Sequence, residues 1–354
     1  MSTLRGWGAH VGAPPGVRAL ALTAQAPIEH EPLRLERRPV PEPGPDEILV
    51  RVGACGVCRT DLHLVEGDLP LVRSPIVPGH QVVGRIERAG AGSTRFEAGA
   101  RVGLAWLRRT CGACAYCASG RENLCERAEF TGYHADGGFA DYAVAPAAFA
   151  YRIPAAFSDA DAAPLLCAGI IGYRALKRSE TPPGGRLGIY GFGSSAHVTL
   201  QVARARGCEV FVCTREASHR DLARRLGAAW AGDLRDSMPV KTDGTIIFAP
   251  VGDLVPQALR NLARGGTLAL AGIHMTPVPA LEYERDLFYE RSIRSVTANT
   301  RADGEELLAE AARIPIRPTT TTFPLEGANR ALQLLKRGAF AGSGVLLTEA
   351  DSRV

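Results

Sequence analysis

Short apolar runs alternate with helical segments through the second half of the chain, and this alternation limits the fold more than any other feature. It begins after a Pro/Gly-rich stretch at residues 182–185. Strands are predicted at residues 186–190, 209–213, 245–249, 267–271 and 293–298, and helices at 195–206, 219–226 and 254–264. Strands separated by single helices form right-handed βαβ units, so this half is predicted to be an α/β fold with a parallel, doubly wound sheet.

The first 150 residues are instead rich in strands and turns. Strands are predicted at residues 48–52 and 81–87, with turns at Gly90, Gly92 and Gly99. This pattern predicts a separate β-rich domain before the α/β domain.

Two further segments fit neither pattern. A helix is predicted at residues 160–176, with Ser158 or Asp159 as its cap. The last 50 residues hold predicted helices at 304–312 and 327–336 and a Thr-rich strand at 318–323. They do not continue the alternation, and we expect them to return to the first domain.

Composition excludes several classes of protein. The 354 residues include 41 Lys and Arg against 37 Asp and Glu, a formal net charge of +4 with scattered basic residues, so no nucleic acid is expected as a partner. No run of 18 apolar residues exists, and no membrane span is expected. Residues 1–16 lack the pattern of a signal peptide and are rich in Gly and Pro, which predicts a flexible leader and a cytoplasmic protein.

Four of the nine cysteines follow the pattern C-x2-C-x2-C-x7-C, at Cys111, Cys114, Cys117 and Cys125. Four thiolates can hold a tetrahedral zinc ion with no open position, which is typical of a structural site. Two disulfides or an iron–sulfur cluster are the alternatives, but disulfides would close very small loops. A zinc ribbon for nucleic acid would need a basic stripe that this segment lacks. The pattern favours a structural zinc lobe at residues 108–126.

A glycine turn follows the first strand of the α/β half. Gly191, Gly193 and Ala196 form G-x-G-x-x-A between a predicted strand and a predicted helix. Such a turn allows the pyrophosphate of a dinucleotide to approach the N-terminus of the helix. Ser194 and Ser195 belong to the same turn and are predicted to contact the cofactor.

The end of the second strand indicates which dinucleotide is bound. NAD enzymes usually place an acidic residue there for the ribose hydroxyls. Thr214 occupies this position and Arg215 follows it. A hydroxyl and a guanidinium suit a 2′-phosphate, so NADP(H) is favoured and NAD(H) stays the alternative. His219 and Arg220 are further candidates for this pocket.

The remaining metal-ligand candidates are Cys55, Cys58, His63, His80 and Cys167. Together with the cysteine lobe and the glycine turn, the segments GVCRTDLH (56–63), PGHQVVG (78–84) and PLLCAG (164–169) resemble the zinc-dependent alcohol dehydrogenases of the medium-chain dehydrogenase/reductase superfamily. The resemblance covers residues 17–348 and is strongest to the bacterial propanol-preferring type.

The resemblance implies a role for each of these site residues. Cys58, His80 and Cys167 would bind a catalytic zinc, with Asp61 orienting the site and Cys55 only packing beside it. Thr60 would contact the substrate oxygen and His63 would pass its proton to solvent. Gln81 stands where the family usually has Glu, which removes one negative charge near the metal. Arg59 would contact the pyrophosphate and Ile273 the cofactor, while the substrate pocket would contain Trp106 and Leu69, with further walls from Phe130 or Thr131 and from residues 273–275.

The predicted function is reversible hydride transfer between NAD(P)(H) and a primary alcohol or aldehyde, with two zinc ions per chain. The alternatives are a polyol or sugar dehydrogenase of the same superfamily and a zinc-binding structural protein without catalysis. The resemblance implies a GroES-like catalytic domain at residues 17–167 and 302–354, a Rossmann domain at 168–301, and a homo-oligomer, either dimer or tetramer.

Overall fold

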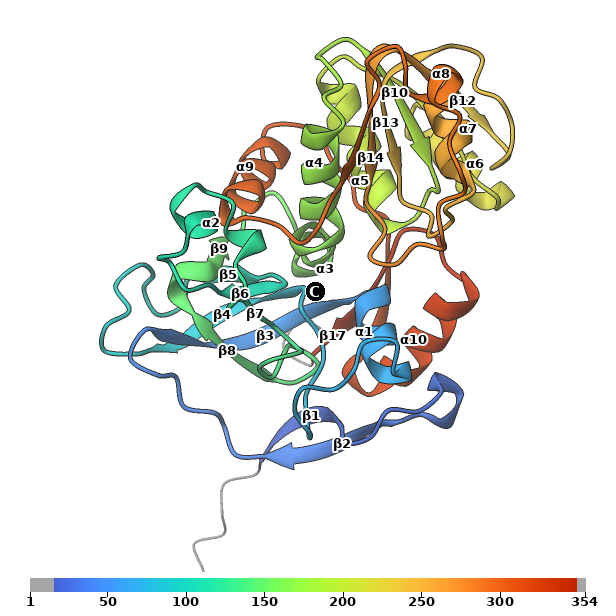
Figure 1. Ribbon diagram of the computed structural model, residues 1–354. Coiled ribbons are helices and arrows are strands. Elements are labelled where there is room, and N and C mark those ends of the chain that lie inside the picture. The colour runs from blue at the N-terminus through green and yellow to red at the C-terminus, as the bar shows by residue number, and fades with distance from the viewer. Residues whose placement is uncertain (1–15, 349–354) are drawn as a thin grey trace, which may run out of the picture.

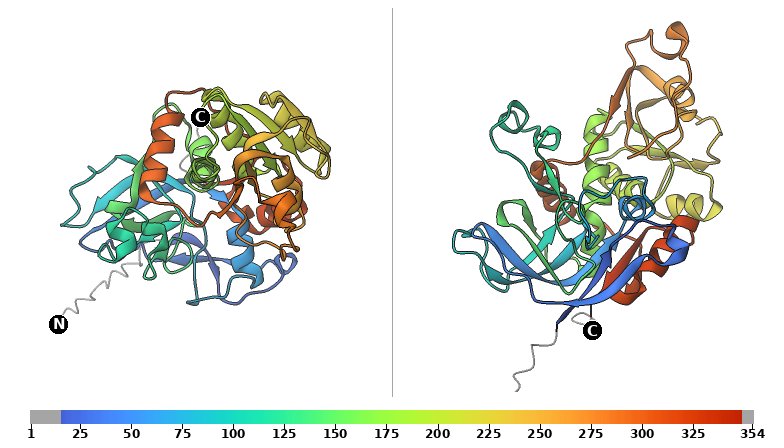
Figure 2. Two further views of the ribbon diagram at one scale, coloured as in Figure 1. Left: turned by 45° about the horizontal axis from the view of Figure 1, so that its top comes forward. Right: turned by 60° about the horizontal axis from the view of Figure 1, so that its bottom comes forward.

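Two large sheets form the frame of the protein in a computed structural model that describes residues 16–348 (Figure 1). The expected leader lies outside the described residues except for Gly16, and so do residues 349–354 of the expected C-terminal segment. Figure 2 shows the two units from two further sides. Within residues 16–348 no helix is both long enough and apolar enough to cross a bilayer.

The first sheet contains six parallel strands in the order β12-β11-β10-β13-β14-β15. Its strands are β10 (Arg186–Tyr190), β11 (Glu209–Cys213), β12 (Trp230–Gly232), β13 (Thr242–Ile247), β14 (Leu262–Leu270) and β15 (Ser292–Ser295). The connecting helices include α5 (Ser194–Ala205), α6 (Ala217–Arg225) and α7 (Leu254–Asn261). This is the doubly wound order of a dinucleotide-binding fold, and the predicted fold class is confirmed. The order reverses between β10 and β13, where such sheets bind ligands.

The second sheet contains seven strands, and it joins the two ends of the chain. Its strands are β3 (Glu47–Val57), β4 (Val82–Ala89), β5 (Arg101–Leu104), β8 (Tyr142–Pro146), β9 (Ala150–Arg152), β16 (Thr320–Pro324) and β17 (Ser343–Leu347). The strand β17, which was not predicted, pairs antiparallel with β3 and parallel with β16. Beside it, helix α10 (Ala328–Arg337) contacts α1 (Arg59–Glu66) through Lys336 and Glu66, whose Nζ and Oε1 are 2.8 Å apart.

Shorter elements complete the described part of the chain. They are β1 (Val17–Leu22) paired with β2 (Leu33–Arg38), β6 (Leu107–Arg109) paired with β7 (Glu129–Phe130), α2 (Ala115–Ala118), α8 (Tyr283–Asp286), α9 (Arg301–Ala311), and the 3-10 turns η1 (Ile28–His30), η2 (Glu122–Leu124), η3 (Ala147–Phe149) and η5 (Leu325–Gly327).

The single helix predicted at residues 160–176 is wrong, because the chain breaks it at Cys167. Helix α3 (Asp159–Ala162) and a 3-10 turn η4 (Ala163–Leu166) precede the break, and α4 (Ala168–Arg178) follows it. Ser158 caps α3 as expected, since its Oγ accepts a hydrogen bond of 3.1 Å from the Asp161 amide. Cys167 has φ −134° and ψ −71°, outside the helical region, so its side chain leaves the helix axis.

A buried histidine connects the nucleotide-binding helix to the C-terminal strands. His197 of α5 has no exposed surface, and its Nε2 accepts a hydrogen bond of 3.1 Å from the Thr319 amide, just before β16. Its Nδ1 lies 3.4 Å from the Gly193 carbonyl oxygen, so the neutral ring donates there. Burial lowers the pKa of His197 from 6.5 to about 4, because the charged form cannot be hydrated.

We predict that His197 makes the protein less stable as the pH falls from about 6.5 to about 4. In this range His197 binds a proton in the unfolded chain but stays neutral in the folded chain. The free energy of unfolding therefore falls by on the order of 3 kcal/mol between the upper and lower ends of the range. His197→Gln keeps an acceptor for Thr319 and removes the titration. Its free energy of unfolding should therefore fall less than that of the wild type as the pH is lowered.

The control for this prediction is the exposed residue His30. His30→Gln should keep the wild-type pH dependence in denaturant titrations. An equal pH dependence for wild type and His197→Gln would contradict the prediction.

Candidate active site

Three side chains from distant segments meet where the two sheets approach each other. Cys58 is the N-cap of α1 directly after β3, His80 precedes β4, and Cys167 lies at the break before α4. The ligand atoms of these three residues all lie within 4.8 Å of one another, and the two sulfur atoms are 3.9 Å apart. This compact set of two thiols and one imidazole has the composition of a three-ligand zinc site.

The buried ring of His80 fits a metal ion. Its Nδ1 lies 3.1 Å from Oδ1 of Asp61, which fixes the ring orientation and leaves the lone pair on Nε2. Nε2 is buried and has no hydrogen-bond partner among the described residues. A buried nitrogen of this kind is costly unless a ligand or a metal satisfies it. The geometry therefore fits zinc bound by His80 Nε2 and two sulfur atoms.

Charges at the site favour the metal-binding form of the sulfur. The hydrogen bond from Cys167, with a further contribution from His80, holds the pKa of the Cys58 thiol well below its usual range. Burial opposes protonation of His80, but the charge and hydrogen bond of Asp61 outweigh burial and raise its pKa to about 10, so without a metal ion Nε2 carries a proton that a bound zinc ion would displace. A thiolate is the form of cysteine that binds metal. The hydrogen bond that favours the Cys58 thiolate also raises the pKa of the Cys167 thiol, so the pair shares a proton that a bound metal ion would displace.

The residues predicted to move protons lie on α1. Thr60 is buried, and its Oγ1 is 3.7 Å from Cys58 Sγ. His63 follows three residues later on the same face of the helix. Its side chain is 28% exposed, and its Nδ1 lies 2.8 Å from Oδ2 of Asp68. The structure thus places Thr60 beside the three-ligand group, and it places His63 where its ring is partly exposed to solvent.

Two other predicted neighbours of the three-ligand group lie in different surroundings. Gln81 is buried and packs against β3, where a Cβ at Gly56 would come within 2.8 Å of the Gln81 Cδ. Arg59, by contrast, is exposed at the first position of α1.

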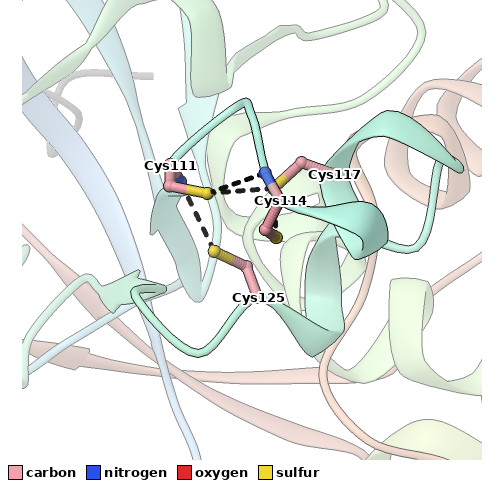
Figure 3. A group of neighbouring side chains, drawn as sticks. All are labelled: Cys111, Cys114, Cys117 and Cys125. Carbon is pink, nitrogen blue, oxygen red and sulfur yellow. Dashed lines mark hydrogen bonds between the residues drawn. The ribbon is translucent and has the colours of Figure 1, made fainter.

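The four predicted lobe cysteines converge on one point between β6 and β7 (Figure 3). Each sulfur lies within 4.8 Å of the other three, and all nine cysteines of the chain are free, so the disulfide alternative is not realised. Backbone amides of Ala113 and Cys114 lower the pKa of Cys111 to about 5. Such N–H donors around the sulfur atoms stabilise thiolates, and the arrangement fits a closed four-thiolate metal site.

The glycine turn lies between β10 and α5. Gly191 has φ +84°, and a Cβ there would come within 2.9 Å of the Ala249 backbone nitrogen at the end of β13, so only glycine suits the position. A Cβ at Gly193 would meet nothing among the described residues, which leaves open space before the helix N-terminus. Ala196 is fully buried against the sheet. This backbone can approach a pyrophosphate closely.

The two serines of the turn make different contacts. The Ser194 hydroxyl is hydrogen-bonded to the hydroxyl of Ser343 on β17. The Ser195 carbonyl accepts a hydrogen bond of 2.8 Å from the Thr199 hydroxyl. Ser194 therefore connects the turn directly to the second sheet.

The end of β11 presents basic side chains, as expected. Thr214 is buried and donates its amide to the Gly232 carbonyl at 3.1 Å. The Arg215 side chain is 81% exposed and pairs with Glu216 at 2.7 Å. Arg220 donates to the carbonyl oxygens of Thr214 and Arg215 at 2.9 and 2.7 Å, which braces the loop. Arg215 can reach a phosphate only by leaving Glu216.

An aromatic wall borders the three-ligand group. The ring of Trp106 lies edge-on to His80 at 5.0 Å and stacks on Phe130 at 4.8 Å. Tyr133, which the sequence did not single out, lies 6.1 Å from Trp106. The buried Thr131 donates its amide to the Trp106 carbonyl and supports the wall from behind.

The other two predicted pocket residues belong to other segments. Leu69 is half-buried and packs on the core of the seven-stranded sheet. Ile273 is exposed, in the loop after β14.

Comparison with known proteins places the chain in a family. Residues 44–155 match the alcohol dehydrogenase GroES-like domain, and residues 196–313 match the zinc-binding dehydrogenase domain. The "Probable alcohol dehydrogenase AdhA" of Mycobacterium tuberculosis is 55% identical over 326 residues, which covers 91% of this chain and 94% of that protein. An alcohol dehydrogenase of Geobacillus stearothermophilus is 36% identical, over 89% of this chain and 96% of its own length.

Solved structures agree with this placement. A cinnamyl alcohol dehydrogenase of Sorghum bicolor superposes with a TM-score of 0.85 at 27% identity, and the match covers 93% of this chain and 97% of that one. The predicted resemblance is therefore confirmed. The chain belongs to the zinc-dependent alcohol dehydrogenases of the medium-chain dehydrogenase/reductase superfamily, enzymes that act on small alcohols and aldehydes with zinc and a nicotinamide cofactor.

Proposed function

We propose that this alcohol dehydrogenase interconverts primary alcohols and aldehydes with NADP(H), using a zinc ion held by Cys58, His80 and Cys167. The observation that carries the proposal is the buried His80 Nε2, which has no partner among the described residues while Asp61 fixes the other ring nitrogen. Three protein ligands leave one zinc position open for substrate. A second, closed zinc ion at Cys111, Cys114, Cys117 and Cys125 would serve structure alone.

The residues of α1 are arranged to remove the substrate proton. When bound, the zinc ion supplies a Lewis acid that lowers the pKa of the substrate hydroxyl. Thr60 Oγ1, beside Cys58 Sγ, is in position to accept a hydrogen bond from the substrate hydroxyl and to relay its proton, donating its own proton onward as it takes the new one. His63 lies one helical turn away with Asp68 on its Nδ1, and its exposed ring can release the proton to water.

The aromatic wall suits an apolar substrate. Trp106 and Phe130 form a flat surface beside His80, and such surfaces bind hydrocarbon rather than strongly hydrated polyols. We infer that primary alcohols and aldehydes with apolar side chains are better substrates than sugars. Tyr133 is included in this pocket because its ring stacks on Trp106, while Leu69 and Ile273 stay proposed wall residues.

The proposed cofactor preference depends on the end of β11. Thr214 itself places no carboxylate near the ribose, and the two acids beside it are paired with arginines, Glu216 with Arg215 and Asp233 with Arg220. Among residues 16–348 the exposed guanidinium of Arg215 is held by Glu216 alone, and a phosphate carrying up to two negative charges competes well for it. Arg59, exposed at the start of α1, is the proposed contact for the pyrophosphate, together with the turn from Gly191 to Ala196.

We further infer the domain division and assembly. The catalytic domain comprises residues 17–167 and 302–354 and the Rossmann domain residues 168–301, since β16 and β17 join the sheet of β3. Strand β15 is an edge strand with Ile293 exposed, and Tyr283 and Phe288 are exposed nearby. Exposed apolar side chains at a sheet edge are typical of a subunit interface, which supports a homo-oligomer.

Asp61→Asn should weaken zinc binding at the three-ligand site about 10- to 100-fold, because the second hydrogen-bonding partner of a ligand histidine tunes its basicity. The measurement is competition for zinc against a chelator of known affinity. Asp68→Asn is the matched control, since Asp68 is exposed and contacts His63 alone among the proposed site residues. Equal zinc affinities for the two variants would contradict the assigned role of Asp61.

Arg215→Ala should raise the KM for NADPH roughly 10- to 100-fold, since a charge-assisted hydrogen bond of about 1.5–3 kcal/mol is lost. The KM for NADH should change little, because NADH has no 2′-phosphate. Initial rates at 340 nm with both cofactors test this. Arg225→Ala, an exposed change at the far end of α6, the helix that follows Arg215, is the control. A wild-type enzyme that prefers NADH, or a variant that loses both cofactors equally, would overturn the proposed preference.

A further inference from the structure

The four-cysteine lobe contacts the segment through which the chain leaves the Rossmann sheet. This crossover, residues 296–303, runs from the end of β15 into α9, and Figures 1 and 2 show α9 beside the lobe. Asn123 of the lobe is buried, and its Nδ2 donates to the Thr297 carbonyl at 2.9 Å. The proposed structural metal site is thus joined to a connection between the two domains.

Glu122 makes the strongest of these contacts. It is buried in the lobe turn η2 and accepts the backbone amide of Arg301, the first residue of α9, at 2.8 Å. The Arg301 guanidinium binds the same carboxylate through Nε and through Nη2, the latter at 2.7 Å. The guanidinium also lies 4.5 Å from the ring centre of Phe149. A carboxylate at a helix N-terminus with a bidentate arginine is a rigid contact.

The opposite side of the same helical turn is attached to the helix that follows Cys167. Asp303 is buried and accepts hydrogen bonds from Arg174 at 2.6 Å and Lys177 at 3.2 Å, both on α4. Its carboxylate also closes a capping box with Thr300. The first turn of α9 is therefore held between the lobe on one side and the helix of a proposed catalytic ligand on the other.

We propose that Glu122 is a positioning residue, which fixes the crossover against the four-cysteine lobe and so sets the place of the Rossmann domain relative to the catalytic zinc. The inference rests on the proposed function, since it assigns to the lobe a task in turnover beyond stability. Without Glu122 the Arg301 guanidinium loses its partner and the first turn of α9 can shift. A small displacement of the nicotinamide from the substrate lowers the rate of hydride transfer steeply.

The test is a double-mutant cycle on the zinc-loaded enzyme with Glu122→Gln, Arg301→Gln and the double variant. We expect each single change to lower kcat about tenfold or more and to weaken cofactor binding, with both zinc ions retained. The KM for the aldehyde should stay near the wild-type value. The double variant should be no worse than either single one, because both remove the same contact. Arg301→Lys, which keeps the charge, should recover part of the rate.

Glu47→Gln is the matched control. Glu47 forms a similarly buried ion pair of 2.6 Å with Arg108 at the base of the lobe, away from the crossover. This variant should lower the melting temperature without changing kcat or cofactor affinity. A Glu122→Gln enzyme that behaves like Glu47→Gln, losing stability alone, would overturn the inference. So would strictly additive losses in kcat across the cycle.

Failure of the proposed function gives a different result. The wild-type enzyme is assayed with NADPH and with NADH, and the better cofactor is used for the cycle. A wild-type preference for NADH overturns the cofactor proposal and leaves the comparison of variants intact. If the wild-type enzyme reduces no aldehyde, the proposed function fails. The double-mutant cycle is then evaluated from the affinity of each variant for the nicotinamide cofactor in place of kcat.

Discussion

The buried carboxylate of Asp61 is the contact on which the rest of the site depends. Its two oxygens accept the Cys58 amide at 2.8 Å, the Gly79 amide at 3.2 Å and the ring nitrogen of His80 at 3.1 Å. One side chain therefore starts helix α1, holds the loop before β4 and orients a ligand ring. Burying a charge is costly unless it is paired and fully hydrogen-bonded, and these three donors meet that condition. Cys167, the third proposed ligand, comes from the break before α4, at the boundary with the proposed Rossmann domain.

The two sheets and the four-cysteine lobe are connected at several places. Ser194 of the nucleotide turn contacts Ser343, and His197 of the same helix accepts the Thr319 amide. The crossover before α9 contacts the lobe through Glu122. Since hydride transfer requires the nicotinamide and the zinc to be held in fixed relation, contacts between domains matter for rate as well as for stability. The lobe contributes to this arrangement although its four thiolates leave no position for substrate.

Local sequence patterns predicted the parts of the protein whose chemistry depends on spacing. The lobe cysteines, the glycine turn and the alternating strands each follow from residues close together in the chain, and the structure brings the predicted residues together. The single helix predicted at residues 160–176 passed over Pro164, which cannot donate a helical hydrogen bond and marks the change to a 3-10 turn, but no local signal placed the break at Cys167 itself. Strand β17 and its pairing with β3 depend on contacts almost 300 residues apart. Tyr133 reaches the aromatic wall by stacking on Trp106, which lies 27 residues earlier in the chain, and no pattern in its own segment indicated a pocket.

The central claim, two zinc sites with separate tasks, is tested most directly by counting zinc in matched variants. Elemental analysis of the wild-type enzyme should give two zinc ions per chain. Cys58→Ser should retain one zinc ion and lose turnover while the protein stays folded, and Cys125→Ser should also retain one but melt at a lower temperature. A wild-type protein with one zinc ion or none, or a Cys58→Ser variant with full zinc and full turnover, would contradict the account.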